Sequence, residues 1–313
     1  MATPSWLSLT ACCLLAAGAF APPASARVLE AGKGKQYALP SDAIDAARDG
    51  DTVEIQPGKY FDCAVVRANH VTIEGVAHDG SAIMTDKVCG GKAILVVAGH
   101  DDTIRYLTLQ RARVPDHNGA GIRTEGVNLT VEGVHFINNE DGLMGGAVEG
   151  STVIVRDSEF VKNGSCLEAC GHGIYVGKID LLKVYHSRFF DTKHAHHIKS
   201  RALRTEVYDS DIEDGPEGTA SYEIDISNGG ALVVKNTVFE KGPQNENHTC
   251  AIRIGAEGVL QPTDEITIEN NTFTNDGPPT LFVDNLTATE AVLKHNTMHG
   301  PVTAKLRGDG SGD

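Results

Sequence analysis

The chain has 313 residues, with 34 glycines, 5% aromatic residues and a formal net charge of −15. A chain with this much negative charge is expected to bind nucleic acid poorly, because binding to phosphates depends on basic side chains. Its many Val, Ile, Thr, Asn and Gly residues argue against a mainly helical protein and favour short strands joined by turns.

Residues 1–26 have the composition of a secretory signal peptide. They contain no Asp, Glu, Lys or Arg, carry an apolar run from Trp6 to Phe20, and end in Ala24-Ser25-Ala26, which is similar to a cleavage site. The run is too short to span a bilayer, and no later segment approaches a spanning length. We therefore predict a secreted or periplasmic protein that has no membrane span and is a monomer.

An exported chain can form disulfides, and five of the seven cysteines follow residue 26. Cys166 and Cys170 lie four residues apart in a turn-like stretch, so we predict a local bridge between them. Cys63 and Cys89 form the next plausible pair, and Cys250 is expected to be an unpaired core thiol.

The next element is a short helix near the start of the exported chain. Pro40 to Arg48 has an amphipathic pattern, with Ser41 expected as the N-cap and Asp49-Gly50 as the end. This segment, residues 41–48, is predicted to cover the first coil of the domain. Strands are expected to follow over residues 51–60 and 71–76.

The main feature of the remaining chain is a repeat of about 25 residues. A short segment related to G-[IL]-x-x recurs seven times, each time followed by a second strand and a turn; the segments begin at Gly121, Gly142, Gly173, His197, Ser221, Ala251 and Leu281. One such repeat cannot close a core, whereas stacked coils bury a continuous apolar column. An antiparallel two-sheet sandwich also has short alternating strands, but it does not explain the common register of the seven segments.

We therefore predict an all-β protein with one domain, a right-handed parallel β-helix over residues 27–305. Residues 306–313 are expected to form a disordered polar tail. The opening from Ala43 to Val76 resembles the start of many proteins of the pectate-lyase-like right-handed β-helix superfamily, and the likeness extends over most of the exported chain. It implies an exported, carbohydrate-active protein.

Alternation of side chains across a strand predicts which residues face outward. With Ile122, Ile174 and Ile198 inside, one outer column contains Arg123, Met144, Tyr175, Lys199, Glu223, Arg253 and Val283. The next outer column carries Arg201 and Asp225, and the preceding column carries His197. Since neighbouring rungs lie about 4.8 Å apart, these side chains are expected to meet in one patch. Residues 178–206 are also rich in Lys, Arg and His, which indicates an anionic ligand.

This patch suits the chemistry of acidic sugars. Removal of the C5 proton of a uronate needs a cation for the carboxylate, a base and a proton donor. We assign Lys199, Arg201, His197 and Tyr175 to catalysis: Lys199 or Arg201 as the cation, with Arg253 as an alternative, His197 or Lys199 as the base, and Tyr175 as the donor. Binding of the substrate is assigned to Arg253, Glu223, Asp225 and Arg123, and Ca²⁺ held by Glu223 and Asp225 is a possible cofactor.

The resemblance agrees in general terms, because β-helix pectate lyases, alginate lyases and mannuronan C5-epimerases place Lys, Arg, His or Tyr on such a face. The sequence departs from them in two respects. It lacks the Asp-Pro-His-Asp signature of periplasmic mannuronan epimerases and a recognisable calcium motif of pectate lyases.

Three other interpretations stay open. Asn139-Glu-Asp-Gly142, Gly171-His-Gly173 and His197-Ile-Lys199 resemble degenerate polygalacturonase motifs, which would make Asp141 the proton donor of a glycoside hydrolase. A non-catalytic carbohydrate-binding protein would use the same patch for recognition, and the charges can also be simple cross-strand ion pairs. Zinc binding by His194, His196 and His197 is disfavoured, because His196 and His197 are expected on opposite faces of the strand.

Overall fold

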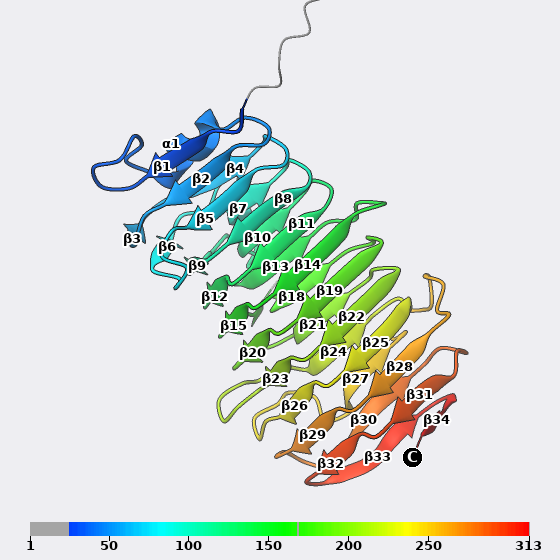
Figure 1. Ribbon diagram of the computed structural model, residues 1–313. Helices are drawn as coiled ribbons and strands as arrows, with labels where there is room; N and C mark the ends of the chain where they lie inside the picture. The colour runs from blue at the N-terminus through cyan, green and yellow to red at the C-terminus, as the bar shows by residue number, and fades with distance from the viewer. Residues whose placement is uncertain (1–24, 168, 313) are drawn as a thin grey trace, which may run out of the picture.

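The computed structural model describes residues 25–167 and 169–312 as a parallel β-helix (Figure 1). Each coil contributes one strand to each of three parallel sheets, here named A, B and C, so successive strands of one sheet come from successive coils. The described residues include one α-helix, α1 (Pro40–Ala46), near the start of the chain. This arrangement confirms the predicted parallel β-helix.

Sheet A has twelve strands, which begin with the first strand of the domain and end with the last. Its strands are β1 (Val28–Ala31), β2 (Thr52–Ile55), β5 (Thr72–Gly75), β8 (Asp102–Arg105), β11 (Leu129–Glu132), β14 (Thr152–Arg156), β19 (Leu181–Tyr185), β22 (Arg204–Tyr208), β25 (Ala231–Lys235), β28 (Ile266–Glu269), β31 (Ala291–Lys294) and β34 (Gly310–Gly312).

Sheet B has ten strands, most of them only three or four residues long. They are β3 (Gly58–Tyr60), β6 (Ala82–Thr85), β9 (Leu107–Gln110), β12 (His135–Ile137), β15 (Glu159–Val161), β20 (Arg188–Phe190), β23 (Asp211–Glu213), β26 (Val238–Lys241), β29 (Thr272–Asn275) and β32 (Thr297–His299).

Sheet C also has ten strands and carries the candidate site on its outer face. They are β4 (Ala64–Val66), β7 (Ala93–Val97), β10 (Ala120–Thr124), β13 (Asp141–Gly145), β18 (Ile174–Val176), β21 (His196–Ser200), β24 (Tyr222–Ile226), β27 (Cys250–Ile254), β30 (Thr280–Asn285) and β33 (Val302–Arg307). A small antiparallel hairpin, β16 (Ser165–Cys166) with β17 (Cys170–Gly171), precedes β18.

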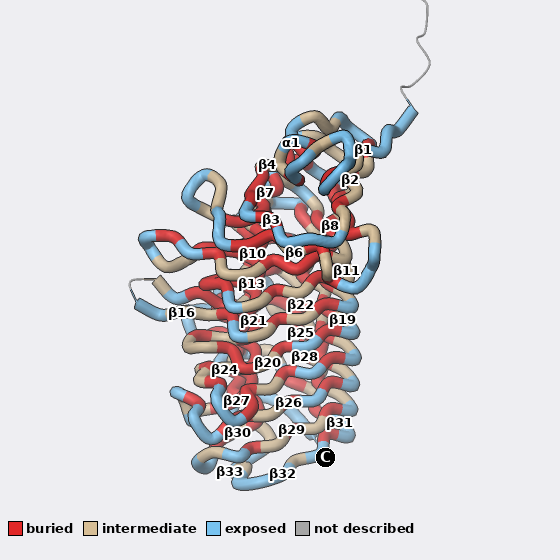
Figure 2. The backbone as a smooth tube through the Cα atoms, turned by 90° about the vertical axis from the view of Figure 1, so that its left-hand side faces the viewer, coloured by how far each residue is buried: buried red, intermediate tan, exposed pale blue. Residues whose placement is uncertain are grey.

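The core is a column of apolar side chains inside the coils. In Figure 2, buried residues recur along the coils from one end of the β-helix to the other. The phenylalanines of sheet B stack from rung to rung, with ring centroids 4.4 Å apart for Phe136 and Phe160 and 4.5 Å apart for Phe160 and Phe189. A Cβ atom at Gly142 would lie 2.6 Å from the Phe160 ring. The glycine of the repeated motif therefore faces inward like the aliphatic residue after it, and strict alternation fails at the start of these strands.

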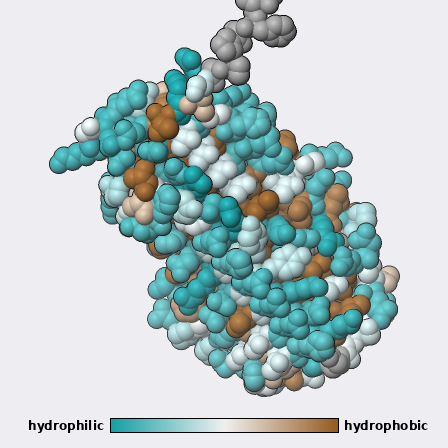
Figure 3. Space-filling model, in the orientation of Figure 1, coloured by the Kyte–Doolittle hydropathy of each residue, from teal (hydrophilic) through white to brown (hydrophobic). Residues whose placement is uncertain are grey.

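The outer surface differs from this interior in composition. In the view of Figure 3, hydrophilic side chains cover most of the molecule, and apolar side chains are scattered between them. Within the described residues, no helix is long and apolar enough to span a membrane. The predicted signal peptide, residues 1–26, lies almost entirely outside the described residues.

Helix α1 begins earlier than predicted. Leu39 occupies the N-cap position, Pro40 lies in the first turn, and no side chain caps the helix. Ser41 lies inside the helix, and its backbone N–H donates to Asp62 Oδ2 at 2.8 Å. The predicted Ser41 N-cap is therefore wrong, because a carboxylate from a neighbouring coil satisfies this amide. The helix packs beside β1, β2 and β4, and its function as a cap of the first coil stays a prediction.

Within residues 306–312 the structure contains strands, whereas a disordered tail was predicted over residues 306–313. Strand β33 continues to Arg307, and β34 pairs with β31. Arg307 Nε donates to Asp284 Oδ1 at 2.8 Å. The preceding coil thus supplies backbone and carboxylate partners that composition alone does not reveal.

The cysteine predictions agree with the structure. Disulfides join Cys63 to Cys89 and Cys166 to Cys170. Cys250 is buried and unpaired among the described cysteines. The second disulfide closes the β16–β17 hairpin beside the candidate site.

Candidate functional site

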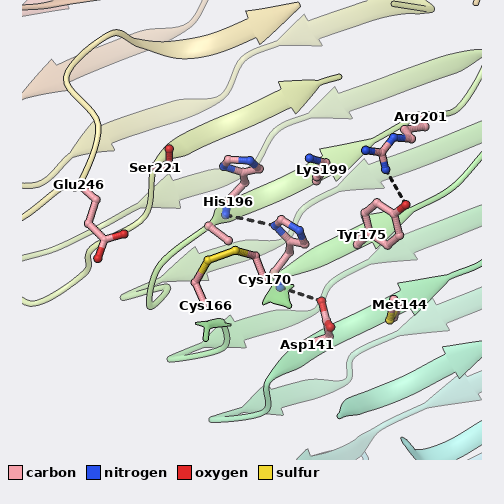
Figure 4. A pocket seen from close by; sticks show the side chains of 12 residues that line it. Asp141, Met144, Cys166, Cys170, Tyr175, His196, Lys199, Arg201, Ser221 and Glu246 are labelled. Carbon is pink, nitrogen blue, oxygen red and sulfur yellow. Dashed lines mark hydrogen bonds between the residues drawn. A yellow bond between two sulfur atoms is a disulfide. The ribbon is translucent and has the colours of Figure 1, made fainter. Parts of the chain in front are cut away.

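The outer face of sheet C contains a cavity of about 500 Å³. It lies across β13, β18 and β21, and the β16–β17 hairpin forms one wall (Figure 4). The lining residues are Asp141, Met144, Cys166, Cys170, His172, Tyr175, Ala195, His196, Lys199, Arg201, Ser221 and Glu246. Three of the predicted site residues, Tyr175, Lys199 and Arg201, are thus brought together.

The observed outer column confirms only part of the predicted register. Arg123, Met144, Tyr175 and Lys199 follow one another as expected. The next members are Asp225, Arg253 and Asp284, in place of the expected Glu223, Arg253 and Val283. The alignment of two segments was therefore wrong: β24 by two residues and β30 by one.

Lys199 and Arg201 supply the positive charge of the site. Lys199 Nζ lies 2.6 Å from Glu257 Oε1 and 3.4 Å from Asp225 Oδ2. Arg201 Nη1 donates to the Tyr175 hydroxyl oxygen at 2.6 Å, and Nη2 pairs with Glu257. Because Arg201 donates to this oxygen, the Tyr175 hydroxyl proton is free to be donated elsewhere.

A column of aromatic rings lies beside these cations. The centroids of His172 and His196 are 5.1 Å apart, and those of His196 and Tyr222 are 5.0 Å apart. Burial, reinforced by the nearby Lys199 charge, lowers the pKa of His196 to about 3. The same causes, with His196 itself, hold the pKa of His172 well below its ordinary value. Both imidazoles are therefore neutral at neutral pH.

His196 has an incomplete set of partners. Its Nε2 lies 3.5 Å from Asp225 Oδ2, whereas its Nδ1 finds no hydrogen-bond partner within the described part of the chain. Its neighbour His197 was the predicted base. His196 nevertheless lines the cavity, and the two histidines face opposite sides of β21, as the alternation argument expected.

Asp141 forms the floor of the cavity and is only 1% exposed. Its Oδ1 accepts a hydrogen bond from the His172 backbone N–H at 2.7 Å, but burial raises the pKa of Asp141 to about 8. Its Oδ2 has no hydrogen-bond partner among residues 25–167 and 169–312. Asp141 is thus a neutral carboxylic acid near pH 7.

His197 and Glu223 lie inside the coil, which contradicts their predicted exposure. Both are 0% exposed, and His197 Nε2 lies 3.0 Å from Asp214 Oδ1 and 3.3 Å from Glu223 Oε2. Lys241 Nζ lies 3.3 Å from Glu223 Oε1. Burial and the neighbouring Asp214 hold the pKa of Glu223 well above its ordinary value. These four residues, here called the interior cluster, contact one another inside the coil and cannot touch a polysaccharide, and Glu223 Oε2 has no hydrogen-bond partner among the described residues.

The remaining predicted binding residues lie on the outer face but outside the cavity lining. Arg253 Nη1 donates to the Tyr222 hydroxyl at 2.7 Å. Arg123 contacts the Met144 sulfur at 2.8 Å. Both arginines lie in the same outward column as Lys199, on either side of the cavity.

The predicted calcium site does not fit the structure. Glu223 belongs to the interior cluster, whereas Asp225 accepts from Ser227 on the outer side at 2.7 Å, so the two carboxylates cannot share an ion. Two groups of described residues could hold a metal ion by their geometry: His70, His100 and Asp101, and His197, Asp214 and Glu223. Neither group contains Asp225 or combines His194, His196 and His197.

The sequence analysis did not select His172, His196 or Tyr222 for the site. Each lies two residues before an inward aliphatic residue, Ile174, Ile198 or Ile224, so strict alternation places them inward, and only their common position in the repeat connected them. Glu257, which pairs with both cations, comes from a turn between two later strands. No sequence pattern connected it to β21.

No family model matches the chain, and no curated protein matches it. Solved structures do. An alginate lyase from Paenibacillus sp. str. FPU-7 aligns with a TM-score of 0.65 and 19% identity, over 91% of this chain and 99% of that one. The pectate lyase Pel9A aligns with a TM-score of 0.61 and 13% identity, over 90% of this chain and 78% of that one. The chain has the pectate-lyase-like parallel β-helix fold.

A third structure shares this β-helix over a smaller part of its own length. The PL6 family alginate lyase AlyGC aligns with a TM-score of 0.51 and 16% identity, over 92% of this chain and 39% of that one. At these identities, the likenesses describe the fold and leave the chemistry to the residues of the site.

Proposed function

We propose that this pectate-lyase-like β-helix protein binds an acidic polysaccharide in the cavity on sheet C and cleaves it by β-elimination. The observation that carries the proposal is the meeting of two cations, a neutral imidazole and a tyrosine around one open cavity. These groups match what removal of the C5 proton of a uronate requires.

The residues take the following roles. Lys199 and Arg201 bind the uronate carboxylate and stabilise the charge that develops when C5 loses its proton. The neutral His196 accepts that proton; because its pKa of about 3 makes it a weak base in the free protein, the step requires the bound, negatively charged uronate to raise that pKa. The electron pair forms the C4–C5 double bond as the C4–O4 bond breaks, and Tyr175 donates its proton to the leaving O4. Arg201, at 2.6 Å, then stabilises the Tyr175 oxygen.

A C5-epimerase would share the first half of this reaction, with the carbanion reprotonated on the opposite face of the ring instead of losing O4. The test is incubation of the protein with alginate, polygalacturonate and bacterial exopolysaccharides. Unsaturated ends, seen by ultraviolet absorbance, are expected. Exchange of C5 hydrogen for solvent deuterium without cleavage would indicate epimerisation, and binding without either reaction would indicate a recognition protein.

Tyr175→Phe and Lys199→Ala are expected to lower the rate of β-elimination by about 100-fold or more, as loss of a general acid or a charge-stabilising group does. Lys183→Ala is the matched control, because Lys183 also pairs with a carboxylate but lies on sheet A. All three variants should keep the melting temperature within a few degrees, since each side chain faces outward. Full activity of both site variants would exclude this site.

A second candidate, glycoside hydrolysis, is favoured by one observation: Asp141 is neutral near pH 7, as a general acid must be. It ranks lower because Asp141 is buried, and because we assign no second carboxylate among the described residues of the cavity to the activation of water. New reducing ends without unsaturation, lost in Asp141→Asn, would favour the hydrolase.

We further propose that the protein acts outside the cytoplasm. Two disulfides within one domain suit an oxidising compartment, and the composition of residues 1–26 agrees with export. Detection of the protein in the periplasmic or culture fraction, with residues 1–26 removed, is the test.

A further inference from the structure

The two cations of the candidate site already hold a carboxylate, that of Glu257. Its Oε1 lies 2.6 Å from Lys199 Nζ, and its Oε2 pairs with Arg201 Nη2. Each oxygen thus contacts a different cation, which is the arrangement expected for a bound carboxylate ligand. Glu257 comes from the turn between β27 and β28, two coils beyond the strand that carries Lys199.

We infer that Glu257 occupies the place of a substrate carboxylate, and that a uronate must displace it to reach Lys199 and Arg201. The inference rests on the proposed function and deepens it by naming the sugar class. Only a substrate with free carboxylates replaces the charge that Glu257 withdraws. Neutral or methyl-esterified sugars cannot.

The backbone of this turn is fixed. Glu257 N–H donates to Ser227 O at 2.8 Å, and the amides of Leu260 and Gln261 donate to Asn228 O at 2.8 and 3.0 Å. The glycines on either side of Glu257, Gly255 and Gly258, have φ values of +82° and +93°, which few other residues adopt. Displacement therefore concerns the Glu257 side chain and does not require the turn to open.

The Glu257 side chain has room to move. It is 42% exposed, whereas Asp225, the other carboxylate on Lys199, is 4% exposed and accepts a hydrogen bond from Ser227 at 2.7 Å. Asp225 is thus a permanent counter-ion and Glu257 an exchangeable one. Partial burial works to raise the pKa of Glu257, but the hydrogen bonds from Lys199 and Arg201 hold it below its ordinary value, so Glu257 is anionic at neutral pH.

Exchange of one carboxylate for another keeps the two cations of the site paired both with and without substrate. While Glu257 is bound, Lys199 and Arg201 are neutralised and attract stray anions weakly. A uronate polymer that displaces Glu257 leaves the two cations paired, so their charges are not left without partners. A neutral or esterified sugar that displaced Glu257 would leave Arg201 without a carboxylate partner and Lys199 with Asp225 alone, which is costly in a partly buried site.

The test measures binding by calorimetry in a Tyr175→Phe background, so that the ligand stays intact. The ligands are an unesterified oligogalacturonate, an alginate oligomer and a fully methyl-esterified oligogalacturonate. Glu257→Gln removes the competing charge and keeps the side-chain size. Glu265→Gln is the matched control, because Glu265 is 43% exposed, lies just beyond the same turn, and pairs at 2.8 Å with Arg204, outside the cavity.

Glu257→Gln is expected to bind the acidic oligomer about three- to tenfold more tightly, because no carboxylate has to be displaced, and to keep its preference for the acidic over the esterified oligomer, while Glu265→Gln binds like the parent. Equal or weaker binding of the acidic oligomer by Glu257→Gln, with its melting temperature retained, would overturn the inference and leave the proposed function standing. If no acidic oligomer binds to either protein, the proposed function itself fails.

Discussion

Sheets A and C are built from the same coils but use their strands differently. In sheet A, strands such as β14, β19 and β22 alternate buried residues, most of them aliphatic, with outward residues, most of them polar. Outward pairs such as Arg156 with Glu132 and Lys235 with Glu269 line its surface at 2.9 and 3.0 Å. In sheet C, β21 and β24 instead bury His197, Glu223 and Asp225.

The difference separates the part of the fold that holds the coils together from the part that carries chemistry. Alternation on sheet A agrees with the burial of a simple apolar face. Where sheet C breaks that pattern, polar groups are buried on strands that lie at or next to the cavity. Such local conflicts between sequence pattern and structure are expected at functional sites.

The largest expected effect on stability comes from a charged substitution on the inward face of sheet C. Ile198 is 0% exposed on β21, so Ile198→Asp buries an unpaired charge and should cost more than about 4 kcal/mol of unfolding free energy. The matched change on sheet A is Thr130→Asp, which places the same charge on an outward position and should cost less than about 1 kcal/mol. Urea unfolding followed by circular dichroism measures both. A soluble Ile198→Asp variant of unchanged stability would contradict the inward register of β21.

A smaller effect compares two lysine–glutamate pairs. Lys241 lies in the interior cluster and is 1% exposed, whereas Lys235 pairs with Glu269 on the outer face of sheet A. Lys241→Met should lower the free energy of unfolding by about 3 kcal/mol, because it leaves buried acids and the Ser221 carbonyl without their partner. Lys235→Met should lower it by less than about 1 kcal/mol. Similar losses of unfolding free energy in the two variants would mean that the interior cluster stabilises the fold no more than an exposed ion pair does.

The smallest effect sharpens the comparison at an exception within sheet A. Asp102 begins β8, is 1% exposed, and has its pKa raised to about 6 by burial. A folded pKa above the unfolded one means that the neutral form contributes stability below about pH 4, and that this contribution is lost as the pH rises through 6. Asp102→Asn cannot ionise and keeps an acceptor for the Val71 amide, which lies 2.8 Å from Asp102 Oδ1. Relative to the parent, it should therefore gain about 1–2 kcal/mol between pH 4 and pH 8 in chemical denaturation. A difference that does not change with pH would argue against a buried, neutral Asp102.

The sequence was sufficient for the architecture because the repeat, the inward aliphatic column and the phenylalanine stack are local and periodic. It also placed Tyr175, Lys199 and Arg201 correctly. It failed at Tyr222 and Glu223, where hydrophobicity favours an inward tyrosine and an outward glutamate. The structure reverses them, because Tyr222 stacks on His196 and Glu223 meets Lys241 from another sheet.

The other errors have the same origin. Asp62 satisfies the Ser41 amide, and Asp284 pairs with Arg307 in the supposed tail; both carboxylates lie more than twenty residues away in sequence. Glu257 reaches Lys199 across 58 residues. A partner supplied by another coil cannot be predicted from the residue pattern of a single strand. The repeat itself can be predicted, because it recurs in the sequence of every coil.

Rung-by-rung pairing also determines where the chain tolerates a change in length. In a solenoid, each coil contacts mainly its neighbours. One more coil inserted before β10 would therefore lengthen the β-helix and leave the distances between the residues that line the cavity unchanged. A coil inserted between β21 and β27 would move Glu257 one coil further from Lys199 and Arg201. The coils before β10 therefore form a scaffold that tolerates a change in the number of coils. From β13 to β28 the number of coils is fixed, because contacts such as those of Glu257 with Lys199 and Arg201 join residues two coils apart.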